Sequence, residues 1–197
     1  MIGGLLSTLA FTSVVGLPTE DRVVAPDLDQ WLVAYERNNA TRTMREEVPE
    51  GESLEHWTRM VSTDRFGGLA ARTTPENYIA DVVRNVERWC PGTQVGPLKS
   101  LSMTGRPATR VTINCPQLSL TGKSVTFTME VTTGTFDLLV NEVAFQGAPT
   151  PADAAWATQF LDNLIYCAGG TTVSACTREP PPRLTKPYHE KPLLPWP

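Results

Sequence analysis

The stretch Ser124–Thr132, SVTFTMEVT, alternates polar and apolar side chains from end to end. A period of two residues is typical of a β-strand that packs one face against a core. Thr133-Gly134 then predicts a turn, and Phe136–Phe145 predicts the strand that returns beside the first. The middle of the chain therefore predicts a pair of antiparallel strands.

Further strand patterns lie on the N-terminal side of this pair. Arg110–Cys115 places its apolar side chains on one face, and Leu98–Thr104 gives a weaker strand pattern. Nearer the N-terminus, Trp31–Glu36 and Thr41–Val48 predict a hairpin. Its turn is expected at Asn38-Asn39, because Asn tolerates positive φ. These segments would extend the same sheet.

Two helices have clear start signals. Thr74-Pro75 is an N-cap followed by proline at the first helical position, and an apolar stripe then runs from Tyr78 to Trp89. Thr150-Pro151-Ala152-Asp153 gives the same kind of start to a last helix, expected to carry the chain to Cys167.

A third helix is expected between Ser53 and Gly67-Gly68. Apolar residues recur there at helical spacing, and Ser53 can cap the first turn. Tryptophans fall on the apolar stripes of all three expected helices, so core packing is a better account of them than a ligand site. These residues are Trp57, Trp89 and Trp156.

The expected order is a hairpin, two helices, several antiparallel strands and a closing helix. Helices grouped around an antiparallel meander are typical of an α+β fold with helices packed on the sheet. The sequence thus predicts a signal peptide over residues 1–16, a linker over 17–30 and a single α+β domain over 31–176. A proline-rich flexible tail is expected over 177–197.

Two short stretches add a resemblance to a known family. Glu47–Glu52, EVPEGE, and Trp57–Val61, WTRMV, together with the element order, look like a family of uncharacterised exported bacterial proteins. The likeness extends from about Trp31 to Cys167, and the family's architecture is similar to the Mog1/PsbP-like α/β/α sandwich. The resemblance implies that fold and an exported protein. Its motifs are short and non-catalytic, so it implies no activity.

The N-terminus predicts export. Ile2–Val15 is apolar, which matches the central region of a signal peptide and is shorter than the roughly 18 residues of a spanning helix. No Lys or Arg precedes Arg22, so a poor leader, a start further upstream and a buried N-terminal helix of a cytosolic protein stay open as alternatives. We expect a periplasmic or extracellular protein whose mature chain has no spanning segment.

Four cysteines support the same compartment. Cys90, Cys115, Cys167 and Cys176 have no redox or metal-ligand spacing, and disulfides persist in oxidising compartments. Three pairings are possible, and we favour Cys90–Cys115 with Cys167–Cys176. The alternative is four buried free thiols in a cytosolic protein.

Composition and spacing argue against several partners. The formal net charge is −4 and no basic stripe is present, so nucleic acid is not expected as a partner. The cysteines lack zinc spacing, and His56 lies far from His189, so no metal and no cofactor is expected. The expected partner is an unknown protein or small-molecule ligand.

Catalytic signatures are weak. No serine lies in a G-x-S-x-G elbow, and Glu46 and Glu47 are neighbours on an expected strand, so they point to opposite faces, unlike a glycosidase pair. His56, with Glu52, Glu55 or Asp64 as its partner, is the first candidate for an acid–base group.

We therefore expect a non-catalytic exported accessory or binding protein, with no catalytic residue assigned. One alternative is an enzyme whose site is assembled from scattered residues around His56. The other is an assembly subunit that docks through the proline-rich tail, where Pro192 and Pro195 have P-x-x-P spacing.

Overall fold

The computed structural model describes residues 20–177 and 184–185, and every structural statement below concerns those residues. Strands and short helices follow one another as β1 (Arg22–Val24), β2 (Trp31–Asn38), β3 (Arg42–Pro49), β4 (Arg59–Phe66), α1 (Pro75–Trp89), β5 (Gln94–Val95), β6 (Lys99–Met103), β7 (Arg106–Cys115), β8 (Val125–Thr133), β9 (Leu138–Gln146), α2 (Pro151–Asp162), β10 (Ile165–Cys167), α3 (Ser174–Thr177) and β11 (Leu184–Thr185).

The described residues form a nine-stranded sheet. Its strand order is β11-β2-β3-β4-β9-β8-β7-β5, and β6 also pairs with β7. All its neighbours are antiparallel except β11 beside β2. Strands β1 and β10 form a separate antiparallel ribbon. The expected antiparallel sheet is confirmed, and it includes the hairpin at residues 31–49 and the pair at residues 125–146.

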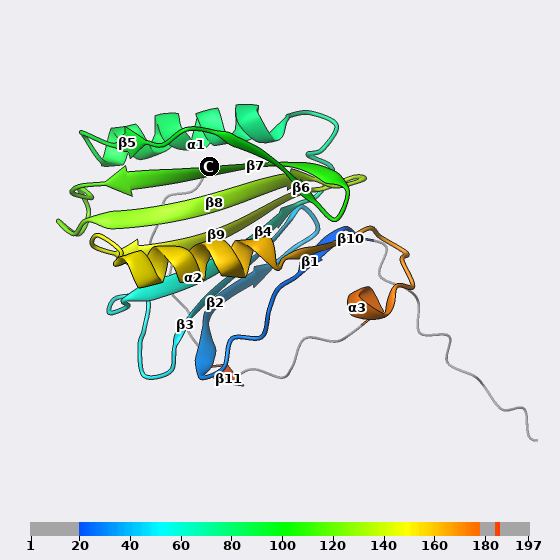
Figure 1. Ribbon diagram of the computed structural model, residues 1–197, viewed down its shortest axis with the longest axis horizontal. Coiled ribbons are helices and arrows are strands. Elements are labelled where there is room, and N and C mark those ends of the chain that lie inside the picture. Colours follow the sequence, from blue (N-terminus) through cyan, green and yellow to red (C-terminus); the bar gives the residue numbers. More distant parts are fainter. Residues whose placement is uncertain (1–19, 178–183, 186–197) are drawn as a thin grey trace, which may run out of the picture.

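One long helix packs on each face of the sheet (Figure 1). Helix α1 lies against β7 and β8, and α2 lies against β9 on the other face. A separate apolar core fills each interface. The first contains Ile79 and Val82 of α1, and the second contains Phe160 and Leu161 of α2. The domain is therefore mostly antiparallel β-structure with a helix on either side.

Helix starts follow the sequence signals. The Thr74 hydroxyl accepts a hydrogen bond from the Asn77 N–H at 3.3 Å, and Pro75 occupies the first turn of α1. At α2, Thr150 and Asp153 form a reciprocal capping box. The end of α2 differs from the expectation, because the chain leaves the helix at Asn163 and Ile165–Cys167 pairs with β1.

The prediction of a helix between Ser53 and Gly67 is wrong. Arg59–Phe66 forms β4, which lies between β3 and β9. Both faces of this strand are covered, so its apolar residues do not alternate, and their spacing imitates a helix. Trp57 is buried in the first core, as expected, but from the turn before β4.

Two smaller expectations also need correction. The segment expected as a linker contains β1, which pairs with β10 and belongs to the domain. Trp89 ends α1 with 37% of its surface exposed, so it is not a core residue. Trp156 is half-buried and stacks on Trp31 with ring centroids 5.7 Å apart. The expected signal peptide lies outside the described residues. Of the expected tail, Thr177 is the last residue of α3 and Leu184–Thr185 forms β11, and the remainder lies outside the described residues.

Both disulfides form in the favoured pairing. Cys90 at the end of α1 bonds Cys115 at the end of β7, with Cα atoms 5.7 Å apart, and both residues are buried in the first core. Cys167 of β10 bonds Cys176 of α3, with Cα atoms 5.6 Å apart. Disulfides of this kind are typical of proteins outside the cytoplasm.

We expect the Cys90–Cys115 bond to contribute more stability than the other. Its sequence separation is 25 residues against 9 for Cys167–Cys176, so the longer loop restricts the unfolded chain more. Removing Cys90–Cys115 should lower the free energy of unfolding by roughly 3–4 kcal/mol, about 1 kcal/mol more than removing Cys167–Cys176. Urea unfolding of the two double-alanine variants checks this prediction. A larger loss for the Cys167–Cys176 variant would contradict it.

Candidate functional site

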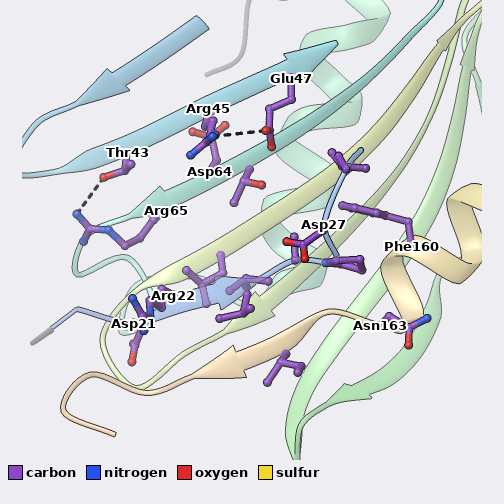
Figure 2. Close-up of a pocket in the computed structure, with 18 of the residues that line it drawn as sticks. Asp21, Arg22, Asp27, Thr43, Arg45, Glu47, Asp64, Arg65, Phe160 and Asn163 are labelled. Carbon is purple, nitrogen blue, oxygen red and sulfur yellow. Dashed lines mark hydrogen bonds and ion pairs between the residues drawn. The ribbon is translucent and has the colours of Figure 1, made fainter. Parts of the chain in front are cut away.

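An open pocket of about 1000 Å³ lies on the α2 face of the sheet (Figure 2). Its floor consists of outward-facing side chains of β2, β3 and β4. On β3 these are alternate residues, Thr43, Arg45 and Glu47, while β4 contributes three consecutive residues, Thr63, Asp64 and Arg65. The floor is polar because no helix covers this part of the sheet.

The walls of the pocket are mostly apolar. One wall is β1 with the chain that follows it to Leu28, and the other is the C-terminal half of α2. Apolar lining side chains come from β1, the chain after it, β9, α2 and β10, and include Val23, Val24, Leu28, Leu139, Trp156, Phe160 and Ile165. A polar floor beside apolar walls suits a ligand that has both characters.

Charged groups on the floor are paired with one another. Arg45 and Glu47 lie 3.5 Å apart, and Arg65 contacts Glu20 at 3.0 Å and Asp137 at 3.1 Å. The Arg45 Nε has no hydrogen-bond acceptor among the described residues, although it is buried. Beside the floor, the buried amide of Asn141 on β9 likewise has no hydrogen-bond partner among these residues. Of these two residues, Arg45 lines the pocket and Asn141 does not.

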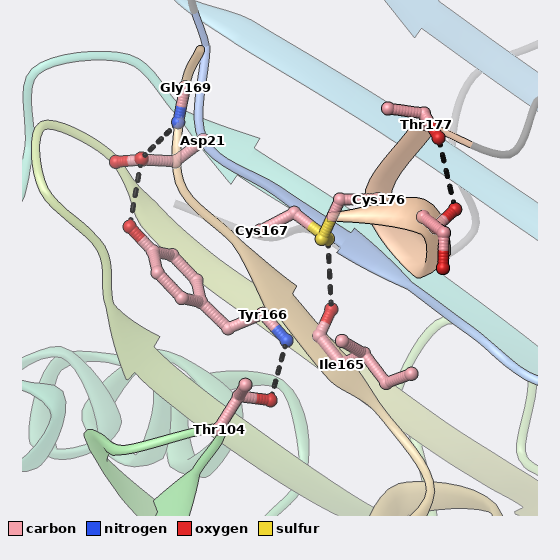
Figure 3. The surroundings of a disulfide bond; sticks show 9 residues. Asp21, Thr104, Ile165, Tyr166, Cys167, Gly169, Cys176 and Thr177 are labelled. Carbon is pink, nitrogen blue, oxygen red and sulfur yellow. Dashed lines mark hydrogen bonds between the residues drawn. A yellow bond between two sulfur atoms is a disulfide. The ribbon is translucent and has the colours of Figure 1, made fainter. Parts of the chain in front are cut away.

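Asp21 holds one end of the pocket together (Figure 3). Its carboxylate accepts hydrogen bonds from the Phe136 N–H at 2.7 Å and the Asp137 N–H at 3.0 Å. It also accepts one from the Gly169 N–H at 3.2 Å, which Figure 3 shows. The Tyr166 hydroxyl donates a fourth at 2.9 Å. One fully buried side chain thus joins the start of β1 to the β8–β9 turn and to the loop after β10.

The surroundings of Asp21 favour its charged form. Burial by itself raises the pKa of this carboxyl, but the hydrogen bonds from Phe136, Asp137, Tyr166 and Gly169 outweigh burial and lower the pKa below its ordinary value. Gly134 also packs against this group, because a Cβ there would lie 2.5 Å from the Asp21 Oδ2. The turn is therefore built around an ionised Asp21.

Behind the floor, on the α1 face, the sheet buries a group of acids. Glu46 and Glu142 flank Ser62 on neighbouring strands, and Asp64 lies one row away. Arg42 binds Asp64 through two nitrogen atoms, at 2.9 and 3.0 Å. Neither carboxylate oxygen of Glu46 has a hydrogen-bond partner among the described residues.

Burial makes these acids hard to ionise. It raises the pKa of Glu46 to about 7, with a further increase from the charge of Asp64. It raises the pKa of Glu142 well above the ordinary range, with Glu46 and Asp64 adding to the effect. The pKa of Asp64 is also raised by burial, although Arg42 opposes this. Arg42 thus compensates Asp64 and, less directly, Glu46.

The structure separates the residues that the sequence singled out. The four cysteines form their two bonds away from the pocket floor. His56 lies in an exposed turn between β3 and β4 and does not line the pocket. Glu46 and Glu47 point to opposite faces, as expected: Glu47 lines the pocket, and Glu46 joins the buried acids.

Sequence reasoning missed the pocket and the Asp21 network. Both depend on contacts between distant segments, and the hydrogen bonds of Asp21 span 115 to 148 residues of sequence. No local pattern marks them. The described residues contain no cluster of three or more His, Cys, Asp or Glu side chains placed to hold a metal ion. They also contain no helix with the length and apolar character of a membrane span.

The fold and the pocket together define a mostly antiparallel β domain with a ligand-sized pocket on one face. No family model and no curated protein matches the chain. A similar solved structure is PA94, a protein of unknown function from Pseudomonas aeruginosa, with 16% identity, a TM-score of 0.43, and coverage of 66% of this chain and 85% of that one.

LpqN, which is involved in cell envelope biogenesis of Mycobacterium tuberculosis, is another similar structure. It is 12% identical, with a TM-score of 0.42, and the match covers 77% of this chain and 87% of LpqN. Likenesses at this level identify neither a family nor a function, so the functional argument rests on the geometry of the site.

Proposed function

We propose that this protein is an exported, non-catalytic binding protein, and that its binding site is the pocket between β1, α2 and the strands β2–β4. The observation that carries the proposal is the pocket itself, with its volume of about 1000 Å³. Binding sites for small molecules and short segments are concave and mostly apolar, with a few polar groups that fix orientation. The apolar walls and the Arg45–Glu47 pair have this arrangement.

Two disulfides support a location in the periplasm or outside the cell, because thiols stay reduced in the cytosol. A helix on each face of an antiparallel sheet is compatible with the Mog1/PsbP-like α/β/α sandwich, which we propose as the architecture. Cleavage near residue 16 would release the mature chain, so N-terminal sequencing of protein recovered outside the cytoplasm tests this part of the proposal.

A non-catalytic role is supported by where the titratable groups lie. Glu46 and Glu142, two of the acids with raised pKa values, are on the α1 face, so the sheet separates them from the pocket. The pKa values of Asp64 and Glu130 are also raised, but Arg42 binds both carboxylate oxygens of Asp64, which lines the pocket, and Arg110 binds Glu130. His56 is exposed on a turn outside the pocket. A general acid or base has to reach the substrate directly or through one water molecule.

Photo-crosslinking tests the site. Gln159 of α2 lines the pocket and is exposed, so p-benzoylphenylalanine can replace it without entering a core. We expect irradiation in the native compartment to give a covalent adduct at this position. The matched control carries the same group at Glu87, an exposed position of α1 on the opposite face of the sheet.

A pocket-filling substitution completes the test. Thr63→Trp places a large ring on the floor and should abolish the Gln159 adduct. Circular dichroism and the urea midpoint report whether that variant still folds, and Thr43→Lys on the same floor gives a second variant without a bulky ring. Equal adducts at Gln159 and Glu87, or an adduct that survives both floor variants, would remove the pocket as the binding site.

A further inference from the structure

The two sides of the pocket present the chain in different ways. On the floor, lining residues of β3 are alternate positions, as expected when a strand turns one face to a cavity. On the β1 side, every consecutive residue from Arg22 to Leu28 lines the pocket. This run places β1 and the chain that follows it along one side of the pocket.

The edge of β1 away from β10 carries no partner strand among the described residues. Strand β1 pairs with β10 along one edge, through Arg22–Cys167, Val23–Tyr166 and Val24–Ile165. Figure 2 shows the β1–β10 ribbon with the pocket on the side of β1 away from β10. The backbone N–H and C=O groups of an unpaired edge are a template for another extended chain.

We propose that the ligand of the pocket is an extended polypeptide segment, which adds to the free edge of β1 as a further strand. This inference rests on the proposed function and names its ligand class. Main-chain hydrogen bonds to β1 would provide affinity, and the floor would receive alternate side chains. Main-chain pairing would be confined to Arg22–Ala25, because β1 ends at Val24 and Pro26 has no N–H to donate, and the segment would continue beside residues 26–28 through side-chain contacts.

Charge at the rim indicates the composition of that segment. Glu20, Asp27 and Glu36 line the pocket and are exposed, although Glu20 is paired with Arg65. Among the lining arginines, Arg22 is half-buried, and Arg45 and Arg65 are largely covered and lie beside acidic partners. The reachable rim is therefore acidic. We expect the segment to carry Lys or Arg at its solvent-facing positions and β-branched or apolar residues at the positions that meet Leu139 and Phe160.

A peptide array with the intact protein tests the proposal. Eight-residue peptides that place Lys or Glu at alternate positions of a Val, Ile and Thr background would be compared by fluorescence anisotropy. We expect the Lys series to bind at least ten times more tightly than the Glu series. Glu36→Lys should reverse part of this preference, whereas Glu87→Lys on the opposite face should leave it unchanged.

Backbone methylation separates strand addition from other binding. In an added strand only alternate N–H groups face β1, so N-methylation of one alternate set should weaken binding at least tenfold and methylation of the other set should have little effect. Equal sensitivity of both sets, or none, would overturn the proposal. So would tighter binding by peptides of residues 1–19 or 178–197, because the occupant would then be the chain's own segment.

The two proposals fail in different ways. If the array gives no binder but the Gln159 crosslinker still captures a non-peptide molecule, the pocket is a binding site and the polypeptide inference is wrong. The proposed function is wrong if two results are found together. The first is that the floor variants Thr63→Trp and Thr43→Lys do not reduce the Gln159 adduct. The second is that the selected peptides bind these variants as tightly as the parent protein.

Discussion

Replacing Asp21 with alanine is expected to lower the free energy of unfolding by roughly 3–5 kcal/mol, because it leaves buried donors without an acceptor. Three backbone N–H groups and the Tyr166 hydroxyl donate to this carboxylate. The loss should be measured by urea unfolding at neutral pH. Asp29→Ala is the matched control, since Asp29 is exposed in the same N-terminal segment.

The effect of Asp21 should also depend on pH. Its folded-state pKa is lowered, so its contribution is present above the unfolded value near 3.8 and is lost as the pH falls through the folded value. The difference between the parent protein and Asp21→Ala should therefore be constant from pH 5 to 8 and shrink below pH 4. A difference that grows on acidification would contradict the role of an ionised Asp21.

Replacing Glu46 with glutamine is expected to stabilise the protein at alkaline pH. The folded-state pKa of Glu46 is raised from 4.5 to about 7, so the parent protein loses stability as the pH rises from the first value through the second. Glutamine carries no charge at any pH in this range. The gain at pH 9 should approach roughly 3 kcal/mol, since each pKa unit corresponds to about 1.4 kcal/mol.

Urea midpoints at pH 5 and pH 9 measure this effect. The two proteins should differ little at pH 5, where the buried acid is protonated, and most at pH 9. Glu50→Gln is the control, because Glu50 is exposed on the turn after β3. A Glu46→Gln variant whose stability differs from that of the parent protein by the same amount at both pH values would contradict the raised pKa of Glu46.

The elements that could be predicted from the sequence carry strong local signals. The alternation at residues 124–132 predicts β8, and the caps at Thr74 and Thr150 predict the starts of α1 and α2. The disulfide pairing also follows from the positions of Cys90 and Cys115 at the ends of a helix and a strand. In each case the local pattern and the tertiary structure favour the same conformation.

Prediction failed where tertiary contacts override local pattern. Strand β4 is covered on both faces, so it lacks the alternation that marks an exposed strand. Strand β1 has only three residues, and its partner β10 lies more than 140 residues further along the chain. The pocket is formed by these two elements, together with α2 and the sheet. Its position could not be predicted without the topology.

Amide hydrogen exchange of the intact protein, with and without the tightest peptide from the array, tests the central claim that ligands bind along β1. We predict slower exchange in the peptide-bound protein at the amides of Arg22–Ala25 and no change at β6, a second strand with one edge unpaired among the described residues. Protection at β6 or α1, with unchanged exchange at β1, would contradict the account.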